Sequence, residues 1–185
     1  MSLQSRNANP APLGLLGFGM TTILLNLHNA GFIEISIVIV AMGLALGGAA
    51  QIIAGITELR LGVTFGGTAF TAYGFFWWSL CLIWVNPFKA EILSADLVSM
   101  GFYLLLWGIF TLFMFIGSLT HNRVTQIVFL SLTLIFFLLA IGDFTGIHSI
   151  TTIAGFVGIF CGSAAMYSAV AQIVNGEFKR VVLPL

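Results

Sequence analysis

The stretch Asn9-Pro10-Ala11-Pro12-Leu13-Gly14-Leu15 leads directly into an uncharged, largely apolar run that continues to Leu27. Proline cannot donate a backbone hydrogen bond, but it is tolerated in the first turn of a helix. The stretch therefore predicts a helix that starts at or within a membrane. Unpaired backbone N–H groups and the positive end of the helix dipole then lie at its beginning, where they favour anionic groups.

The composition around this stretch is that of an integral membrane protein. Of the 185 residues, 59% are hydrophobic and only 6% are charged, whereas charged residues make up about a quarter of soluble domains. A membrane span needs about 20 apolar residues. Six segments qualify, at 13–30, 33–56, 65–85, 97–119, 124–142 and 148–174. We expect an all-α membrane protein in which six transmembrane helices occupy residues 9–176, between tails at 1–8 and 177–185.

Basic residues predict how these spans are oriented. Five of them, on alternate loops and both tails, fall on the side of the N-terminus, and only Lys89 falls on the other: Arg6, Arg60, Arg123, Lys179 and Arg180. Lys and Arg accumulate on the cytoplasmic side of membrane proteins. Both termini are therefore expected in the cytoplasm, and we interpret the polar N-terminus as a retained tail rather than a signal peptide.

The residues that bind metals and cofactors are sparse. Cys81 and Cys161 both lie in apolar spans, without metal-ligand spacing, and are interpreted as packing residues. His28, His121 and His148 lie at span ends, so no pair of histidines is available inside the bundle for haem or metal. We expect no cofactor. The net charge of zero gives no reason to expect a nucleic-acid partner.

The second span carries a regular seam of small residues with one amide in it. Its members recur every four residues on one helix face: Gly43, Gly47, Gln51 and Gly55. The glycines favour close helix packing. An unpaired amide at mid-membrane costs several kcal/mol, so Gln51 either meets another polar group or lines a wet path. Glu58, further along the face, either shapes a pore mouth or pairs with Arg60.

Hydroxyl groups recur along three spans. A single buried Ser or Thr usually bonds back to its own helix, but so many of them, with no Lys, Arg or His at the centre of any span, favour a path lined by neutral donors. Such donors bind a small anion weakly enough to release it. The candidates are Thr21 and Thr22 on the first span, Thr64, Thr68 and Thr71 on the third, and Thr151, Thr152, Ser163 and Tyr167 on the sixth.

Several motifs, in order along the chain, resemble the acetate uptake transporter family of succinate–acetate permeases. They are 9–15, Gly17-Phe18-Gly19-Met20-Thr21-Thr22, Asn26-Leu27-His28-Asn29, Gly48-Ala49-Ala50-Gln51, 64–77 and 110–115. The resemblance covers roughly residues 8 to 185. It implies a multi-pass protein of a bacterial inner membrane or archaeal plasma membrane, not an enzyme. It also implies a homo-hexamer in which each subunit has its own pathway. The implied substrate is acetate, with succinate as a larger candidate.

The resemblance also assigns a constriction, formed by Phe18, Tyr73 and Leu132. Together with the polar side chains described above, the resemblance gives six further pathway candidates: Asn9, Thr21, Thr22, Gln51, Thr71 and Glu58. The coupling stays open. The lack of mid-span acids favours a channel, whereas the family is usually described as proton symporters. An acetate-responsive sensor or assembly protein without flux is the alternative; an aquaporin is disfavoured because a second Asn-Pro-Ala half-helix is missing.

Overall fold

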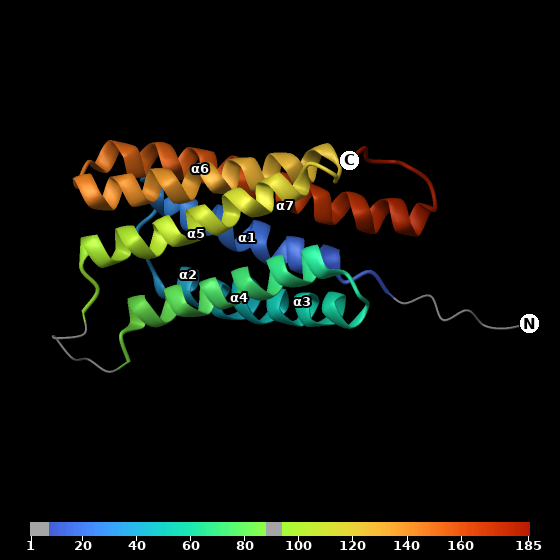
Figure 1. Cartoon of the computed structure of the whole chain (residues 1–185), viewed down its shortest axis with the longest axis horizontal. Helices are drawn as coiled ribbons and strands as arrows, with labels where there is room; N and C mark the ends of the chain where they lie inside the picture. Colours follow the sequence, from blue (N-terminus) through green and yellow to red (C-terminus); the bar gives the residue numbers. More distant parts are fainter. Residues whose placement is uncertain (1–7, 88–93) are drawn as a thin grey trace, which may run out of the picture.

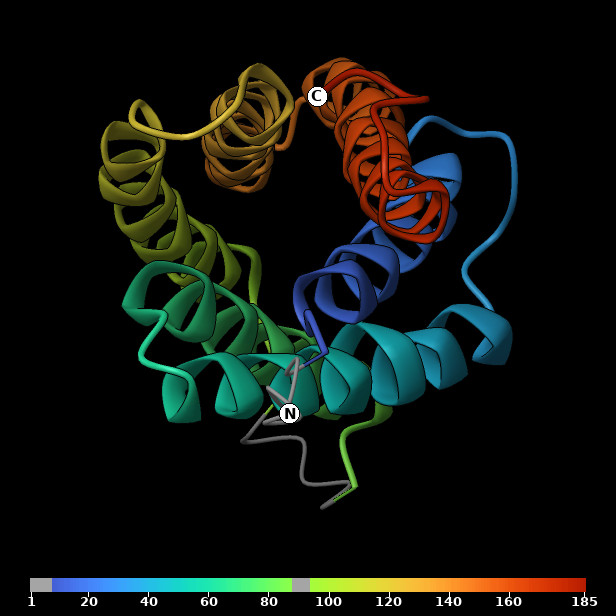
Figure 2. The same cartoon turned by 90° about the vertical axis from the view of Figure 1, so that its right-hand side faces the viewer.

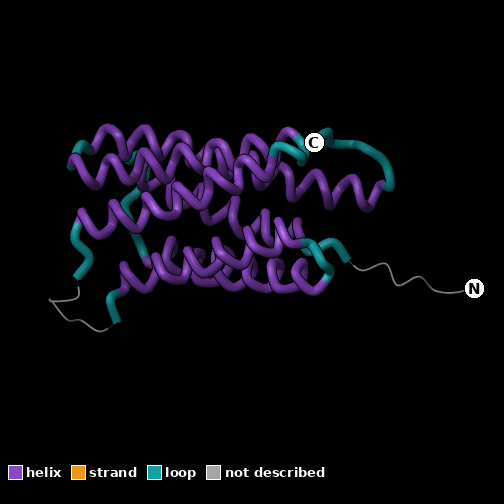
Figure 3. The backbone as a smooth tube through the Cα atoms, in the orientation of Figure 1, coloured by secondary structure: helices purple, strands orange, loops and turns teal. Residues whose placement is uncertain are grey.

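The computed structural model describes residues 8–87 and 94–185, and over these ranges the chain is helical without any strand (Figures 1 and 3). Six helices of 19 to 31 residues are long and apolar enough to cross a membrane, as predicted. The elements are α1 Ala11–Asn29, α2 Ile37–Met42, the π-helix η1 Gly43–Ala50, α3 Gln51–Arg60, α4 Thr64–Val85, α5 Leu97–Ser118, α6 Arg123–Thr145 and α7 His148–Phe178. The elements α2, η1 and α3 run on as one span, Ile37–Arg60.

The first helix begins where the proline motif predicts. Pro10 precedes α1, and Pro12 occupies its first turn, where no backbone donor is needed. The Asn9 Oδ1 atom accepts a hydrogen bond from the backbone N–H of Ala11 at 3.1 Å. Asn9 therefore satisfies one of the unpaired donors at this helix start.

The second span ends later than the sequence predicted. The polar run from Glu58 to Arg60 was expected to break the helix at residue 56, but α3 continues through Arg60. The chain turns only at Gly62, whose φ of +79° is a conformation that favours glycine. Charged side chains at a membrane surface do not stop a helix, because its backbone bonds stay intact.

The glycine seam of the second span packs against α4, but through a π-helix rather than a regular α-helix. A Cβ on Gly43 would lie 2.6 Å from the Cys81 sulfur, and one on Gly47 would lie 2.7 Å from the Trp77 ring. The wider π-turns displace carbonyl groups from regular α-helical bonding. The indole N–H of Trp78 donates to one of them, the Leu44 carbonyl, at 3.0 Å.

The spans form a closed ring, seen end-on in Figure 2. Around it, α1 packs on α7, α7 on α6, α6 on α5, and α4 on η1 and α3, which return to α1. The α4–α5 interface is much thinner than the others. The tightest crossing joins α1 to α7, where a Cβ on Gly19 would lie 2.7 Å from the carbonyl oxygen of Gly162.

Charged residues divide between the two ends of the ring. Arg60, Arg123, Lys179 and Arg180 lie at the end where α1 begins, since each follows or precedes a helix terminus there (Figure 1). Asp96 and Asp143 belong to the opposite end. Arg6, Lys89 and nearly all of the predicted tail at 1–8 lie outside the described residues. The sidedness of the termini therefore stays a prediction.

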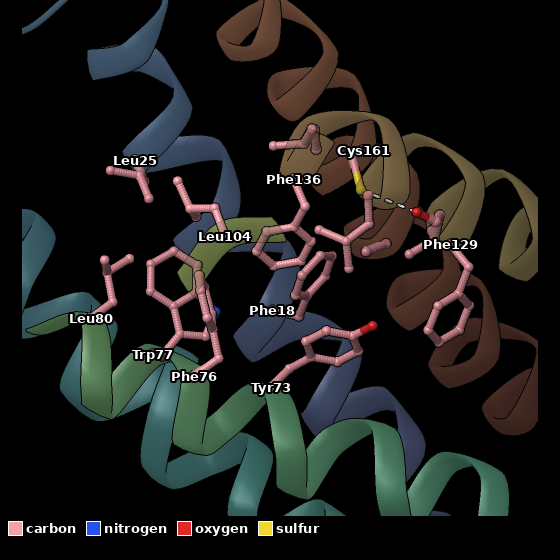
Figure 4. Close-up of a cluster of buried hydrophobic side chains, with 14 of the residues drawn as sticks. Phe18, Leu25, Tyr73, Phe76, Trp77, Leu80, Leu104, Phe129, Phe136 and Cys161 are labelled. Carbon is pink, nitrogen blue, oxygen red and sulfur yellow. Dashed lines mark hydrogen bonds between the residues drawn. The ribbon is translucent and has the colours of Figure 1, made fainter. Parts of the chain in front are cut away.

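The interior of the ring is rich in aromatic side chains, and its outside is apolar, with both aliphatic and aromatic side chains exposed. Figure 4 shows Phe18, Tyr73, Phe76 and Phe136 pointing toward one another from α1, α4 and α6. The Phe76 and Phe136 rings meet edge to face, with centroids 5.2 Å apart. On the outside, large apolar side chains of α5 such as Leu106 are two-thirds exposed. This pattern suits a protein whose outer surface contacts lipid or further subunits.

Candidate functional site

A wide cavity of about 200 Å³ runs into the ring from the end where α1 begins. Ala11, Val63 and His121 line its outer part, and Phe18, Tyr73 and Leu132 line its deepest part. The wall between them carries the polar side chains of α3, α6 and α7: Gln51, Glu58, Thr125, Ser168 and Gln172. Polar groups from several helices thus converge on one space, which is the usual arrangement of a ligand site.

A second, small cavity of about 30 Å³ lies beyond it, between α1, α4 and α6. Thr22, Asn26 and Asn29 give it a polar wall on α1, and Trp77 lies on the α4 side. A space of this size holds about one water molecule. The small cavity therefore continues the line of the wide cavity toward the other end of the ring.

Phe18, Tyr73 and Leu132, here called the constriction trio, line both cavities. Each is nearly buried, with 6%, 3% and 5% of its surface exposed. The Phe18 and Tyr73 rings lie with centroids 6.2 Å apart (Figure 4). The three residues that the family resemblance assigned to a constriction are thus brought together where the two cavities meet.

A hydrogen bond from a neighbouring helix fixes the tyrosine of the trio. The Tyr73 hydroxyl donates to the Thr111 hydroxyl oxygen at 2.9 Å, and the Thr111 hydroxyl donates to the Trp107 carbonyl at 2.7 Å. This chain of donors crosses the thin α4–α5 interface. Thr111 was not among the predicted site residues, because its only signal is a contact between helices.

Among the described residues, five of the six buried polar side-chain atoms without a hydrogen-bond partner lie along the two cavities, and the sixth is the Thr71 hydroxyl oxygen. In the wide cavity they are both amide atoms of Gln51 and the Glu58 Oε2 atom; in the small cavity they are the Thr22 hydroxyl and the Trp77 indole N–H. An unsatisfied buried polar group costs about 1–3 kcal/mol. These atoms therefore favour a polar occupant, water or ligand, on both sides of the constriction trio.

Three predicted pathway residues lie outside both cavity walls. Thr21 is fully buried and donates to its own helix at the Gly17 carbonyl, 2.8 Å away. Thr71 packs against Gly55 in the α3–α4 contact. Asn9 is exposed, and its amide N–H donates to the Gln172 side-chain oxygen at 2.9 Å. Asn9 thus holds a residue of the wall and is not itself part of it.

Of the four hydroxyls expected on the sixth span, those of Thr151 and Thr152 are half-buried but line neither cavity, and the other two face outward. Ser163 and Tyr167 are exposed; the first donates to the Ile159 carbonyl, and the second to the Pro184 carbonyl of the C-terminal segment. Thr64 and Thr68 on α4 are exposed as well. Their place is taken by Ser168, which is 1% exposed and lines the wide cavity. Helix α7 is apolar around most of its surface, so sequence patterning does not identify its inner face.

The site contains few charged or titratable side chains. Among the described residues that line the two cavities, Glu58 is the one with a fixed charge, and no Lys or Arg accompanies it. Glu58 makes no ion pair with Arg60, which is exposed. His121, expected only at a helix end, also lines the wide cavity, and its ring packs against Phe65 with centroids 4.4 Å apart.

A ring of six membrane helices that encloses two polar-walled cavities, separated by a constriction, defines a membrane transport protein. The particular family follows from sequence comparison. The model of the GPR1/FUN34/yaaH family matches residues 2–185, and the chain belongs to this family.

Named relatives and a solved structure place the chain more closely. It is 52% identical over 178 residues to the succinate-acetate/proton symporter SatP of Escherichia coli, covering 96% of this chain and 95% of that protein. Acetate permease A of Emericella nidulans is 33% identical over 203 residues, covering 100% of this chain and 68% of the relative. The solved structure of the bacterial acetate channel SatP superposes with a TM-score of 0.94 at 52% identity, covering 97% of this chain and 99% of that one. These are transporters or channels and not enzymes.

Proposed function

We propose that this protein carries acetate, with succinate as a larger substrate, across the cell membrane along a pathway within each subunit. The pathway runs from the wide cavity past the constriction trio into the small cavity. The observation that carries the proposal is the row of unpartnered polar atoms on both sides of Phe18, Tyr73 and Leu132. The similarity to a symporter and a channel named for acetate supports the choice of substrate.

Neutral donors suit a small carboxylate that has to be released again. The Gln51 amide and the Ser168 hydroxyl line the wide cavity and donate hydrogen bonds without a fixed positive charge. A buried cation would hold the anion too tightly for conduction. At the trio, three bulky side chains leave no polar surface, so a hydrated ion is excluded and a small, partly apolar solute passes.

We further propose that the wide cavity opens to the cytoplasm. Arg60, Arg123, Lys179 and Arg180 lie at its end of the ring, in agreement with the bias of basic residues toward the cytoplasmic side. Residues 1–8 and 177–185 are then cytoplasmic tails on a transport domain at 9–176. The membrane is a bacterial inner membrane or an archaeal plasma membrane.

The outer face of α5 supports association with further copies of the chain. Phe102, Leu106 and Phe113 are each more than half exposed, and they form an apolar surface parallel to the pathway. Closed rings are the usual form of repeated identical contacts. We propose a hexamer, with the lipid bilayer covering whatever surface the subunits leave free.

Acetate uptake into liposomes that contain only this protein tests the proposal. We expect uptake of labelled acetate above that of protein-free liposomes, and loss of that excess in a Leu132→Trp variant, which fills the constriction. The absence of protein-dependent uptake at any pH would overturn the proposal and leave the sensor or assembly alternative. Reversal potentials measured against separate acetate and proton gradients then separate anion conduction from symport.

A further inference from the structure

Glu58 has no role in the donor-lined pathway described above, yet it lies within it. Only 5% of its surface is exposed, it lines the wide cavity, and its Oε2 atom has no hydrogen-bond partner. A buried carboxylate is normally paired with a cation or bound by several donors. Glu58 has neither among the described residues, although Arg60 is two positions away on the same helix.

The backbone of α4 fixes the position of this carboxyl group. A Cβ built on Gly66, in the first turn of α4, would collide with the Glu58 Oε2 atom. Glycine at this position therefore allows the carboxyl group to lie directly against the helix. The carboxyl group therefore lies against the first turn of α4 in the wall of the wide cavity, within reach of a substrate in that cavity.

Among the described residues, no Lys, Arg, Asp or second Glu side chain lines the wide cavity beside Glu58. From α4 the lining contributes one titratable side chain, Tyr73, and from the α5–α6 turn it contributes His121. The linings from α1, α6 and α7 are apolar or neutral, and α7 supplies Ser168 and Gln172. Arg60, on Glu58's own helix, is exposed. A proton gained or lost in this cavity therefore belongs to Glu58, to His121 or to the substrate.

Resting on the transport function proposed above, we propose that Glu58 binds the proton that accompanies each carboxylate through the pathway. Two ionised carboxylates in a cavity of about 200 Å³ repel each other, so the pair holds one proton between them. The Gln51 amide lies seven residues earlier on α3, about 10 Å along the helix. It receives the substrate between Glu58 and the trio.

The transfer is a balanced proton exchange, described here for a substrate that enters from the wide cavity; for one that arrives through the trio, the same steps run in reverse and Glu58 accepts the proton. A proton from water binds a carboxylate oxygen of Glu58, and the entering substrate carboxylate accepts a hydrogen bond from the resulting O–H group. The O–H bond of Glu58 breaks as an O–H bond forms on the substrate, which leaves ionised Glu58 and the neutral acid. The neutral acid is the form that the apolar trio admits at the lowest cost, because charge is not desolvated there.

The test uses monofluoroacetate as the probe in liposomes containing the full chain. This substrate stays almost fully ionised from about pH 5 to about pH 8, so the concentration of its anion is constant over this range. Uptake is taken as the excess over protein-free liposomes at each pH, which removes the small neutral fraction that crosses lipid unaided. We expect uptake by the unmodified protein to fall at least tenfold over this range and to be insensitive to an imposed membrane potential. In Glu58→Gln, we expect the uptake to vary less than twofold with pH and to follow the potential, because the anion then moves alone.

Matched variants keep the result interpretable. Arg60→Gln changes a charge at the same end of the same helix and is expected to leave the pH profile unchanged. His121→Gln is expected to leave it unchanged as well. If Glu58→Gln does not accumulate in the membrane, Glu58→Asp keeps the acid and is expected to keep the pH dependence at a lower rate.

Three results would overturn the proposal: a pH profile of Glu58→Gln that parallels the unmodified protein, a flat profile in Glu58→Asp, or a flat profile in His121→Gln. If the protein does not transport carboxylates at all, the same experiment gives a different result. In that case the unmodified protein gives no uptake of acetate or monofluoroacetate above protein-free liposomes at any pH, and the variants change nothing.

Discussion

Replacing Thr111 with valine tests whether its hydrogen bond holds the Tyr73 ring in the constriction. Valine has the shape of threonine but lacks the hydroxyl oxygen that accepts the Tyr73 bond at 2.9 Å. Tyr73 is 3% exposed and surrounded by aromatic rings, with the Phe110 ring centroid 5.6 Å away. Its hydroxyl then has no protein acceptor in the arrangement seen here.

The magnitude follows from that lost acceptor. A buried hydroxyl left without a partner costs about 1–3 kcal/mol, and each 1.4 kcal/mol is about a tenfold change in an equilibrium constant. The cost applies to the arrangement in which the ring lies in the constriction, and not to one in which the hydroxyl reaches water or substrate in a cavity. If the constriction limits flux, Thr111→Val should raise acetate flux about tenfold by shifting the population toward the second arrangement.

Acetate uptake into liposomes, measured together with thermal unfolding in detergent, checks this expectation. Tyr73→Phe removes the hydroxyl itself and leaves no unsatisfied donor, so it should change flux much less, and in the double variant the gain caused by Thr111→Val should be lost. Thr133→Val is the matched control. Thr133 is also buried, but its hydroxyl donates only to its own helix at the Phe129 carbonyl, 2.7 Å away.

Three outcomes would refute the reasoning. Unchanged or reduced flux in Thr111→Val, with the protein folded, would mean that the hydrogen bond does not restrain the constriction. An equal gain in Thr133→Val would mean that loosening the bundle anywhere raises flux. Additive effects of the Thr111 and Tyr73 substitutions would show that the two hydroxyls act independently.

Three further predictions concern the constriction, the wide cavity and the helix crossing. Leu132→Ala should raise uptake of lactate relative to acetate at least about tenfold, since space for one extra carbon is worth about 1–3 kcal/mol; an unchanged ratio of the two labelled substrates contradicts the constriction. Gln51→Leu should lower acetate flux about tenfold at normal expression, through loss of a donor worth about 1–3 kcal/mol, and full activity would return Gln51 to a packing role. Gly19→Ala should destabilise the α1–α7 crossing by about 1–3 kcal/mol and lower the melting temperature, whereas Gly176→Ala, with open space around it, should not; equal melting temperatures would contradict this.

The six spans could be predicted because hydropathy and length are properties of the chain alone. The error at the second span arose because Glu58 was interpreted as the end of a helix, when it is a buried residue of one. In the sequence, an acid that ends a span cannot be told from an acid that is buried within the last turns of that span. Only the position of α4, and of Gly66 within it, puts the carboxyl group inside the bundle.

The composition of the site was harder to predict than the spans. The resemblance to a known family led to Phe18, Tyr73 and Leu132, of which Leu132 lies outside the quoted motifs, and Gln51 stood out as an amide in an apolar run. Nothing in the sequence distinguishes Ser168 and Thr111, because buried serines and threonines commonly donate hydrogen bonds to carbonyl groups of their own helix. Choosing Ser168 and not Ser163 requires knowing which side of α7 faces the cavity, and a helix apolar on most sides does not give that information.

The pairing of α1 with α7 has a consequence for how the chain is made. The first helix to leave the ribosome packs most closely against the last one: Gly158 of α7 abuts the Asn26 side chain, and the Gly19 backbone meets Gly162. Until α7 is synthesised, the side of α1 that carries Asn26 lacks the helix that packs most extensively against it. Assembly of this subunit is therefore finished only when α7 joins α1 and α6, and a chain cut short before α7 leaves the Asn26 side chain without this cover.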